Sequence, residues 1–163
     1  GGWAIGSIID TNDQSGYEFL NNFMENTPGI FKYMINATGG QLYDFKRTNG
    51  IEGYNGKLDP YRGMPIGTFL YTSARDIGNI AAGYIAGLYN ISWKSTRFAF
   101  DTLQSRQDGK PSTEGISSQN AQYLGWKIGQ HNFAFTYRFL PSLVRTITTP
   151  TDIIHFLNKL SNL

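Results

Sequence analysis

The residues in this sequence that could carry acid–base or ion-binding chemistry fall in three places. A carboxylate and a lysine lie two positions apart, an arginine, a carboxylate and an amide follow within one short stretch, and a glutamate comes later. They are Asp44, Lys46, Arg75, Asp76, Asn79 and Glu114. A carboxylate can serve as a general base, a cation beside it can hold an anionic group, and an amide can orient either of them. These residues are therefore the candidate catalytic set.

We expect residues 66–91 to form the central helix that positions the middle group. Apolar residues recur there at three- and four-residue steps, which is the period of a buried helical face. A second stripe is small and polar and carries Asp76 and Asn79, with Arg75 on its flank. The interior also holds three glycines, Gly78, Gly83 and Gly87. Each costs about 1 kcal/mol of helix propensity relative to alanine, so the close approach of a neighbouring backbone or a ligand must compensate. The alternative is that Arg75 and Asp76 only fix this helix in the core.

The segment 41–65 is expected to contain a small β-hairpin. Its two Asn-Gly pairs, at 49–50 and 55–56, suit the positive φ angles of hairpin turns. On an extended strand Asp44 and Lys46 would emerge on one face, with their α-carbons about 7 Å apart. That arrangement presents an acid beside a cation. The alternative is a solvated hairpin edge that the lysine protects from pairing with other strands.

Capping residues and apolar periodicity predict further helices. They begin at or next to Ser15, Pro28, Ser92, Ser117 and Thr149. The pair Arg97 and Asp101, four positions apart in the helix that follows Ser92, is interpreted as structural. Glu114 lies near the first turn of the helix over 117–130, where the helix dipole favours a carboxylate. As a general acid, Glu114 would need burial as well.

The residue pattern after position 130 does not select one secondary structure. His131 directly follows the helix over 117–130, and a histidine there is interpreted as an interaction with the helix dipole rather than as a catalytic proton carrier. Aromatic residues alternate over 132–140, which is typical of a strand, although the same residues could extend the preceding helix. His155 is expected at the surface of the last helix. The fold class is therefore mainly α (α+β), a helical bundle around the Gly/Ala-rich helix with a small β-hairpin.

Length and composition exclude several classes of protein. The 163 residues contain no repeat or convincing linker, so we expect a single domain over 1–163. A net charge of +2 is too small for a protein that coats duplex nucleic acid. Without cysteine there is no thiol chemistry, and no metal-ligand or nucleotide-binding motif is present, so no cofactor is predicted. The charges at Arg75 and Asp76 argue against a membrane span through the central helix.

Three motifs follow one another in an order that resembles the type 44 domain of bacterial polymorphic toxins. In that family a tryptophan or tyrosine followed by Asp-x-Lys precedes a helix with D-x-G-N-x-x-x-G. The matching positions are Tyr43, Asp44 and Lys46, then Asp76, Gly78, Asn79 and Gly83, and a polar segment over 114–122 followed by Gly125. The resemblance covers about half of the chain.

The resemblance implies that this chain is the C-terminal toxin domain of a larger exported protein, secreted or injected into a target bacterium and neutralised in the producer by a cognate immunity protein. The first residues contain no initiator methionine or leader pattern, which agrees with a fragment of that kind. The substrate, RNA or peptidoglycan, remains open at this point.

Three functions fit the candidate set. In a metal-independent ribonuclease, Lys46 and Arg75 would hold the scissile phosphate while Asp44 or Asp76 acts as base and Asn79 orients it. In a peptidoglycan glycosidase, two carboxylates drawn from Asp44, Asp76 and Glu114 would flank the glycosidic bond, and aromatic residues would receive the sugar faces. The third is a non-catalytic module whose polar stripe binds a partner protein. No stable membrane insertion is expected of any of them.

Overall fold

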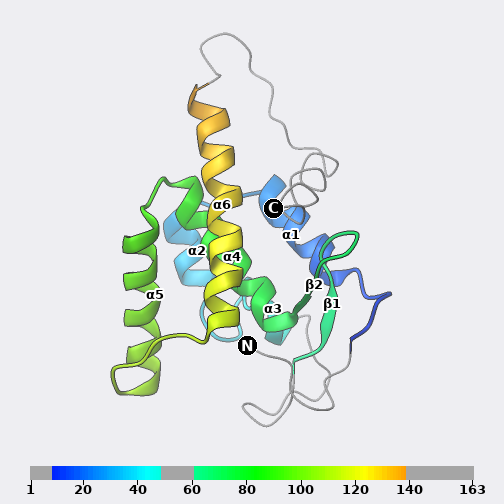
Figure 1. Cartoon of the computed structure of the whole chain (residues 1–163), viewed down its shortest axis with the longest axis horizontal. Coiled ribbons are helices and arrows are strands. Elements are labelled where there is room, and N and C mark those ends of the chain that lie inside the picture. The colour runs from blue at the N-terminus through cyan, green and yellow to red at the C-terminus, as the bar shows by residue number, and fades with distance from the viewer. Residues whose placement is uncertain (1–8, 49–60, 139–163) are drawn as a thin grey trace. The chain divides into compact units, whose positions relative to one another are not determined.

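The computed structural model describes residues 9–48 and 61–138. Over these residues the chain is mainly helical with one small antiparallel sheet, which confirms the predicted fold class. Contacts divide the described residues into two compact units, which we call the N-terminal unit (residues 9–48 and 61–78) and the C-terminal unit (residues 79–138). Helix α4 (Ala74–Leu88) supplies residues to both (Figure 1).

Three helices of the N-terminal unit gather around an aromatic core. They are α1 (Ser15–Glu25), α2 (Ile30–Asn36) and α3 (Phe45–Thr48). The Phe23 ring packs edge-on against Tyr33 and Tyr43, with centroids 5.7 and 5.2 Å away, and Phe19 packs against Phe45 at 4.9 Å. Burial of aromatic surface on this scale is the main stabilising contribution available to a unit with such short helices.

The sheet of the N-terminal unit consists of β1 (Gly63–Pro65) and β2 (Tyr71–Ser73). They pair antiparallel in the register Gly63↔Ser73, and Ile9 adds a parallel bridge to Gly63. Met64 is fully buried. Helix α1 approaches it closely, because a Cβ on Gly16 would lie only 2.9 Å from the Met64 sulfur.

One prediction in this unit is wrong. Residues 43–46 do not form a strand, because the chain turns and enters α3, so Asp44 and Lys46 do not emerge on one face of a hairpin. The predicted turns at the Asn-Gly pairs 49–50 and 55–56 lie outside the described residues, and the hairpin that the structure describes is formed by β1 and β2. The turn before α3 uses the buried Asp44 carboxylate as its hydrogen-bond acceptor, which the alternating sequence pattern could not indicate.

The central helix is shorter than predicted. Helix α4 begins at Ala74 rather than near Ile66, because residues 66–70 form a turn and β2 follows. The Ser73 hydroxyl accepts the Asp76 backbone N–H at 3.2 Å, and this satisfies one of the free amides of the first turn. Ile66 is still buried, at 2% exposure, so its place in the core was predicted correctly although its secondary structure was not.

The C-terminal unit packs α5 (Trp93–Asp108) and α6 (Ile116–Arg138) with residues 79–88 of α4. The predicted cap of α5 is confirmed, since the Ser92 hydroxyl accepts the Ser95 N–H at 3.1 Å, and Gly109 ends this helix at φ 66°. Of the two alternatives for 132–140, the extension of the preceding helix is confirmed where these residues are described, because α6 continues to Arg138, and the strand is wrong. His131 is therefore inside a helix rather than at its end, and its proposed interaction with a helix terminus is removed.

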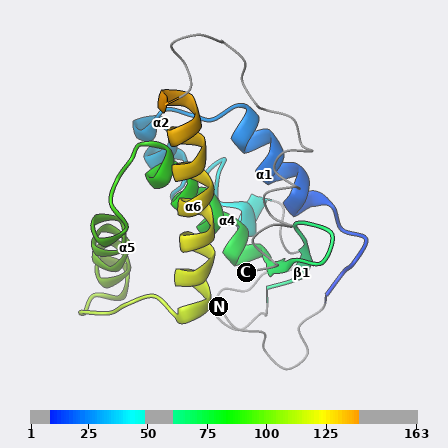
Figure 2. The same ribbon diagram turned by 45° about the horizontal axis from the view of Figure 1, so that its top comes forward.

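Glycines bring α4 and α6 into direct backbone contact. A Cβ on Gly83 would lie 2.7 Å from the Gln122 carbonyl carbon, and one on Gly125 would lie 2.8 Å from the Ile80 carbonyl carbon. Gly87 and Gly129 repeat this contact one turn further along each helix. The two helices run alongside each other in both ribbon views (Figures 1 and 2). The compensation expected for the cost of Gly83 and Gly87 is thus the close approach of a neighbouring backbone. The same prediction is wrong for Gly78, because no atom lies within 4 Å of a Cβ built there.

Candidate functional site

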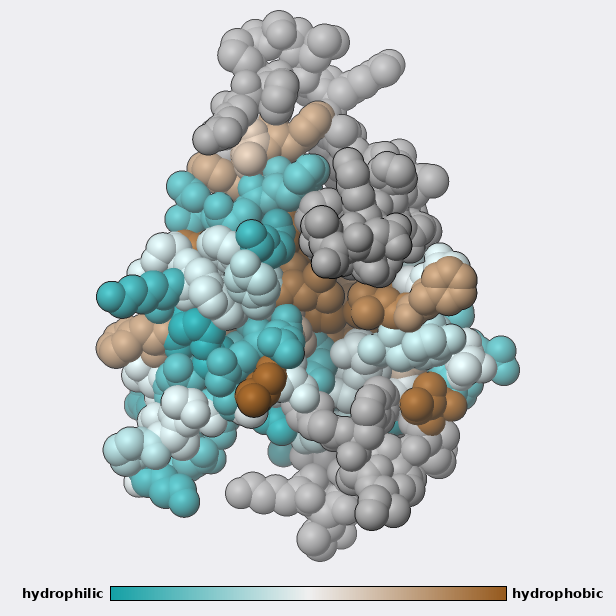
Figure 3. All heavy atoms as spheres, in the orientation of Figure 1, coloured by the Kyte–Doolittle hydropathy of each residue, from teal (hydrophilic) through white to brown (hydrophobic). Residues whose placement is uncertain are grey.

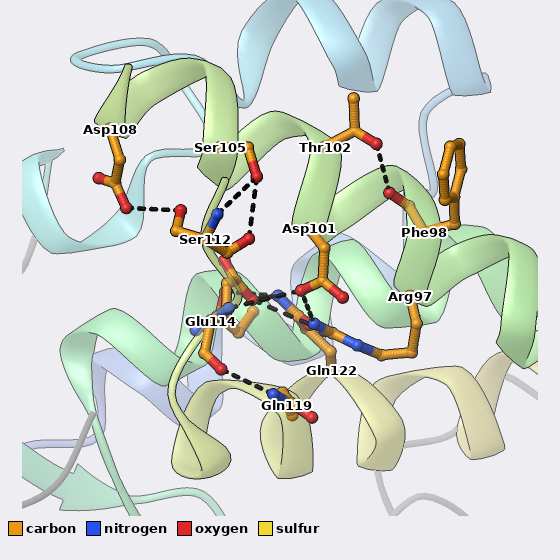
Figure 4. Close-up of polar contacts among 11 residues, drawn as sticks. Arg97, Phe98, Asp101, Thr102, Ser105, Asp108, Ser112, Glu114, Gln119 and Gln122 are labelled. Atoms are coloured by element: carbon orange, nitrogen blue, oxygen red, sulfur yellow. Dashed lines mark hydrogen bonds and ion pairs between the residues drawn. The ribbon is translucent and has the colours of Figure 1, made fainter. Parts of the chain in front are cut away.

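A network of charged and amide side chains lies between the helices of the C-terminal unit (Figure 4). Its centre is the Arg97 guanidinium, which donates to the Asp101 carboxylate through Nη2 and to the Gln122 side-chain oxygen through Nη1. Nη1 also lies 3.8 Å from Glu114 Oε2. A guanidinium has five N–H donors, so this cation can hold two carboxylates and an amide and still have donors left for a ligand.

Gln122 connects this cation to two residues of the candidate set. Its amide nitrogen donates to Glu114 Oε2 and, at 3.2 Å, to Asn79 Oδ1. Both contacts of the Glu114 carboxylate therefore involve Oε2, and within the described ranges Oε1 has no hydrogen-bond partner. Glu114 is anchored at one oxygen and leaves the other available to accept a proton.

The network is largely shielded from water. Gln122 is 1% exposed, and the side chains of Arg97 and Glu114 are each 14% exposed, whereas Asp101 is 31% exposed. Charged groups interact more strongly where water is excluded. Hydrogen bonds to buried charges are also stronger than those between neutral groups. The arrangement is thus suited to holding charges in fixed positions.

Local sequence explains how each member is placed. Arg97 and Asp101 are four residues apart on α5 and so share one face of that helix. Glu114 precedes α6, and its backbone N–H lies 3.4 Å from Asp101 Oδ1, which fixes the loop against α5. Gln122 follows two turns into α6, and the glycine contact between α4 and α6 brings Asn79 within reach of it.

The candidate set is therefore divided. Asn79 and Glu114 come together through Gln122, and Asp44, Lys46, Arg75 and Asp76 belong to the N-terminal unit. Asp44 Oδ2 accepts the Gly40 N–H at 2.8 Å, and Asp76 Oδ2 accepts the Ser73 hydroxyl at 3.0 Å. Both carboxylates are buried.

The two cations of the N-terminal unit are placed differently from its two acids. Lys46 and Arg75 are half-buried and form no salt bridge with any residue in the part of the chain that the structure describes. Their charge is therefore available to a ligand. Their part in catalysis remains a prediction.

Sequence reasoning did not include three members of the network in the candidate set. Arg97 and Asp101 were interpreted as a structural pair, and their spacing gave no sign that Glu114 would join them. Gln122 entered the sequence analysis only as part of the polar segment over 114–122. One signal in the sequence could have identified Gln122. Glycines such as Gly83 and Gly125 allow two helices to approach closely, and side chains near such glycines then come into contact.

A second ion pair lies in the N-terminal unit. Arg62 Nη2 contacts Asp13 Oδ2 at 2.7 Å, and the Ser15 N–H donates to Asp13 Oδ1 at 3.0 Å. Burial by itself raises the pKa of Asp13, but the hydrogen bonds from Ser15 and the charge of Arg62 outweigh this effect, and the pKa is lowered. The ionised Asp13 carboxylate therefore stabilises the folded state.

Burial raises the pKa of the Tyr33 hydroxyl far above its usual range.

Within residues 9–48 and 61–138, no three His, Cys, Asp or Glu side chains are grouped so that they could hold a metal ion. None of the helices described is both long enough and apolar enough to cross a membrane. No protein-family model, curated protein or solved structure matches this chain.

Proposed function

We propose that this chain is an antibacterial toxin domain that cleaves RNA without a metal ion, with Glu114 and Arg97 at its catalytic centre. The observation that supports this best is the shielded network in which Arg97 and Gln122 hold one oxygen of Glu114 and leave the other available. A positioned carboxylate beside a fixed cation is the combination that phosphodiester cleavage by general-base catalysis requires.

In the proposed reaction, Glu114 Oε1 accepts the proton of a ribose 2′-hydroxyl. The 2′-oxygen attacks the adjacent phosphorus and forms a new P–O bond, and the bond to the 5′-oxygen breaks. That oxygen takes a proton from a water molecule, and the hydroxide that remains takes the proton from Glu114, which returns to its starting state. The products are a 2′,3′-cyclic phosphate and a free 5′-hydroxyl. The remaining Arg97 donors stabilise the charge that develops on the non-bridging oxygens, and Gln122 with Asn79 positions the carboxylate.

The contacts of the network favour a nuclease over a glycosidase. A glycosidase needs one carboxyl group as a proton donor and a second as base or nucleophile. Glu114 and Asp101 both contact the same Arg97 guanidinium, whereas a glycosidase places its two carboxyl groups on either side of the glycosidic bond. A carboxylate beside a shared cation suits proton abstraction next to a phosphate, so peptidoglycan cleavage is the second candidate.

Two further cations support an anionic substrate. Lys46 and Arg75 are half-buried and lack salt-bridge partners within the described residues, so each can contact a backbone phosphate. Asp44 and Asp76 are the alternative bases. Both accept hydrogen bonds that fix local backbone or a cap, and we assign them a positioning role in this proposal.

The biological setting is part of the same proposal. The motifs around Asp44 and Asp76 support a type 44 toxin domain, delivered into a rival bacterium as part of a larger exported protein. A cognate immunity protein would bind the domain in the producing cell and block access of RNA to Glu114.

Expression in two compartments tests the substrate class. The domain is produced from an inducible promoter in bacterial cytoplasm and, separately, with an export signal. We expect growth arrest with loss of intact RNA after cytoplasmic expression, and no arrest in either compartment for Glu114→Gln. Lysis that occurs only after export would replace the nuclease with the glycosidase.

A further inference from the structure

Three aromatic side chains on α5 and α6 form a continuous group in the C-terminal unit. Tyr123 and Trp126 stack with their ring planes 17° apart and their centroids 5.8 Å apart, and Trp93 meets Tyr123 edge-on at 5.0 Å and Trp126 at 5.8 Å. We call Trp93, Tyr123 and Trp126 the aromatic platform. Such a group is usually core, but here Tyr123 is 40% exposed and both tryptophans are half-buried.

One member of the platform is fixed by a hydrogen bond. Trp126 Nε1 donates to the Ile91 carbonyl at 2.8 Å, in the segment between α4 and α5. This bond holds the indole ring in place, and stacking then orients Tyr123 against it. A ring that is held before a ligand arrives costs less conformational entropy when the ligand binds. The platform is thus preorganised as well as partly exposed.

Cations lie at both ends of the platform. Lys127 Nζ is 5.4 Å from the Tyr123 ring centroid and 5.7 Å from that of Trp126, and the Arg97 guanidinium carbon is 5.8 Å from the centroid of Trp93. Lys127 is exposed and ends a flexible four-carbon stem, so its charge can move from the rings to a nearby phosphate.

Arg97 joins the platform to the catalytic network. The same guanidinium that pairs with Asp101 and contacts Gln122 lies over the Trp93 ring. Tyr123 also directly follows Gln122 on α6. The residues over α5 and the neighbouring part of α6 are mainly hydrophilic or near neutral in hydropathy (Figure 3). This surface is therefore suited to a polar, charged ligand rather than to an apolar protein face.

We infer that the aromatic platform stacks an unpaired base of single-stranded RNA next to the scissile phosphate. The inference rests on the proposed nuclease function and specifies its substrate as single-stranded. A base has a π face that stacks on Tyr or Trp, and the phosphate beside it is drawn to Lys127, whereas the Arg97 charge is already shared with Asp101 and Glu114. In duplex RNA the bases are already stacked on each other, so this platform selects unpaired strands. Sugar rings also lie on aromatic faces, but neutral glycans gain nothing from Lys127 and Arg97.

The inference can be tested by binding without cleavage. A fluorescein-labelled, unstructured 2′-O-methyl RNA oligonucleotide is used, because it lacks the free 2′-hydroxyl that the proposed reaction consumes. Its binding is followed by fluorescence anisotropy with the whole chain and with Tyr123→Ala, Tyr123→Phe and Phe98→Ala. Phe98 is the matched control, since it is an aromatic residue of the same unit with 76% exposure and no ring partner among the described residues. Circular dichroism confirms that each variant is folded.

We expect Tyr123→Ala to weaken binding by about 5- to 150-fold, the range for loss of one base–aromatic stack, while Tyr123→Phe and Phe98→Ala bind as the unchanged protein does. Lys127→Met should reduce the slope of log affinity against log salt by about 0.7, the value for one phosphate of a single strand. Equal binding by duplex RNA, wild-type binding by Tyr123→Ala, or Tyr123-dependent binding of N-acetylglucosamine oligomers in place of RNA would each overturn the inference.

These results separate the inference from the proposed function. If the domain cleaves unmodified RNA and Tyr123→Ala leaves KM and binding unchanged, the inference about the aromatic platform is wrong and the proposed nuclease function is retained. If the oligonucleotide binds in a Tyr123-dependent manner but unmodified RNA is not cleaved, the inference about the aromatic platform is retained and the proposed nuclease function is wrong.

Discussion

Replacing Gly83 by alanine should separate α4 from α6 and weaken both the fold and the network. An added Cβ would lie 2.7 Å from the Gln122 carbonyl carbon. Carbon atoms in favourable contact are about 3.5–4.0 Å apart, so the helices must move apart by at least about 0.8–1.3 Å to accept the methyl group, because the Gln122 carbonyl oxygen lies nearer still. The Gln122 Nε2 to Asn79 Oδ1 distance is already 3.2 Å, and the smaller of these movements would bring it to about 4.0 Å, beyond hydrogen-bonding range.

Gly78→Ala is the matched control on the same helix. No atom lies within 4 Å of a Cβ built on Gly78, so alanine there gains helix propensity without a clash, worth about 0.5–1 kcal/mol. Gly83→Ala makes the same gain but forces a contact against rigid backbone, and overpacking of this kind costs about 1–3 kcal/mol or more. We expect the free energy of unfolding to rise for Gly78→Ala and to fall for Gly83→Ala.

Urea unfolding followed by circular dichroism measures both changes. A gap of about 1–3 kcal/mol between the two variants is expected, because the gain in helix propensity is common to both and only Gly83→Ala carries the cost of overpacking. Equal stability of Gly83→Ala and the unchanged protein would refute the backbone contact between α4 and α6. A loss as large in Gly78→Ala would show that alanine destabilises α4 even where it meets no atom, and the explanation from close approach would be wrong.

Three further predictions concern other parts of the chain. Asp13 has a lowered pKa beside Arg62, so its contribution to stability is present above the unfolded pKa of about 3.9 and is lost as pH falls through the folded value. The difference in unfolding free energy between the unchanged protein and Asp13→Asn should therefore shrink as urea titrations are repeated toward pH 3, and a constant difference would contradict this role. Ser92→Ala removes the cap of α5 and should cost about 1 kcal/mol in urea unfolding, and no loss would show that the cap is not used. Lys46→Ala and Asp76→Asn should abolish growth inhibition while retaining the circular dichroism spectrum, and wild-type killing by either variant would remove that residue from the mechanism.

The sequence was most informative where side-chain periodicity decides the structure. The apolar spacing around Ile77, Ile80 and Tyr84 identified the buried face of α4 correctly, since all three are at most 3% exposed. Glycines opposite that face indicated a close approach, which the contact of Gly83 with α6 confirms. Both inferences depend only on positions along one helix, and these are fixed by helical geometry.

The sequence failed where a local hydrogen bond or a distant partner decides the structure. Alternation at 43–46 predicted a strand, but the Asp44 carboxylate accepts a backbone N–H in a turn before α3, and a period of two cannot reveal that bond. The start of α4 was placed too early because Ile66 has helical spacing with later apolar residues. In the structure it is buried from a turn, and Ser73 caps the helix.

The candidate site required information about which helices meet. Glu114 and Asn79 were chosen for their chemistry alone, and nothing in their spacing predicted that Gln122 would bridge them. Arg97 was assigned to a structural pair because an i, i+4 contact with Asp101 accounts for it fully within one helix. Its additional contact with Glu114 depends on the path of the loop between α5 and α6.

The most direct test of the central proposal is cleavage of single-stranded RNA by the purified domain in the presence of EDTA, compared with Glu114→Gln. Glutamine keeps the shape of the side chain but cannot accept the proton, so cleavage should fall by about 10²–10⁴-fold while the unfolding transition is retained. The unchanged domain should leave 2′,3′-cyclic phosphate ends. Cleavage by folded Glu114→Gln at the unchanged rate would contradict the account, because the network would then hold a residue that the reaction does not use.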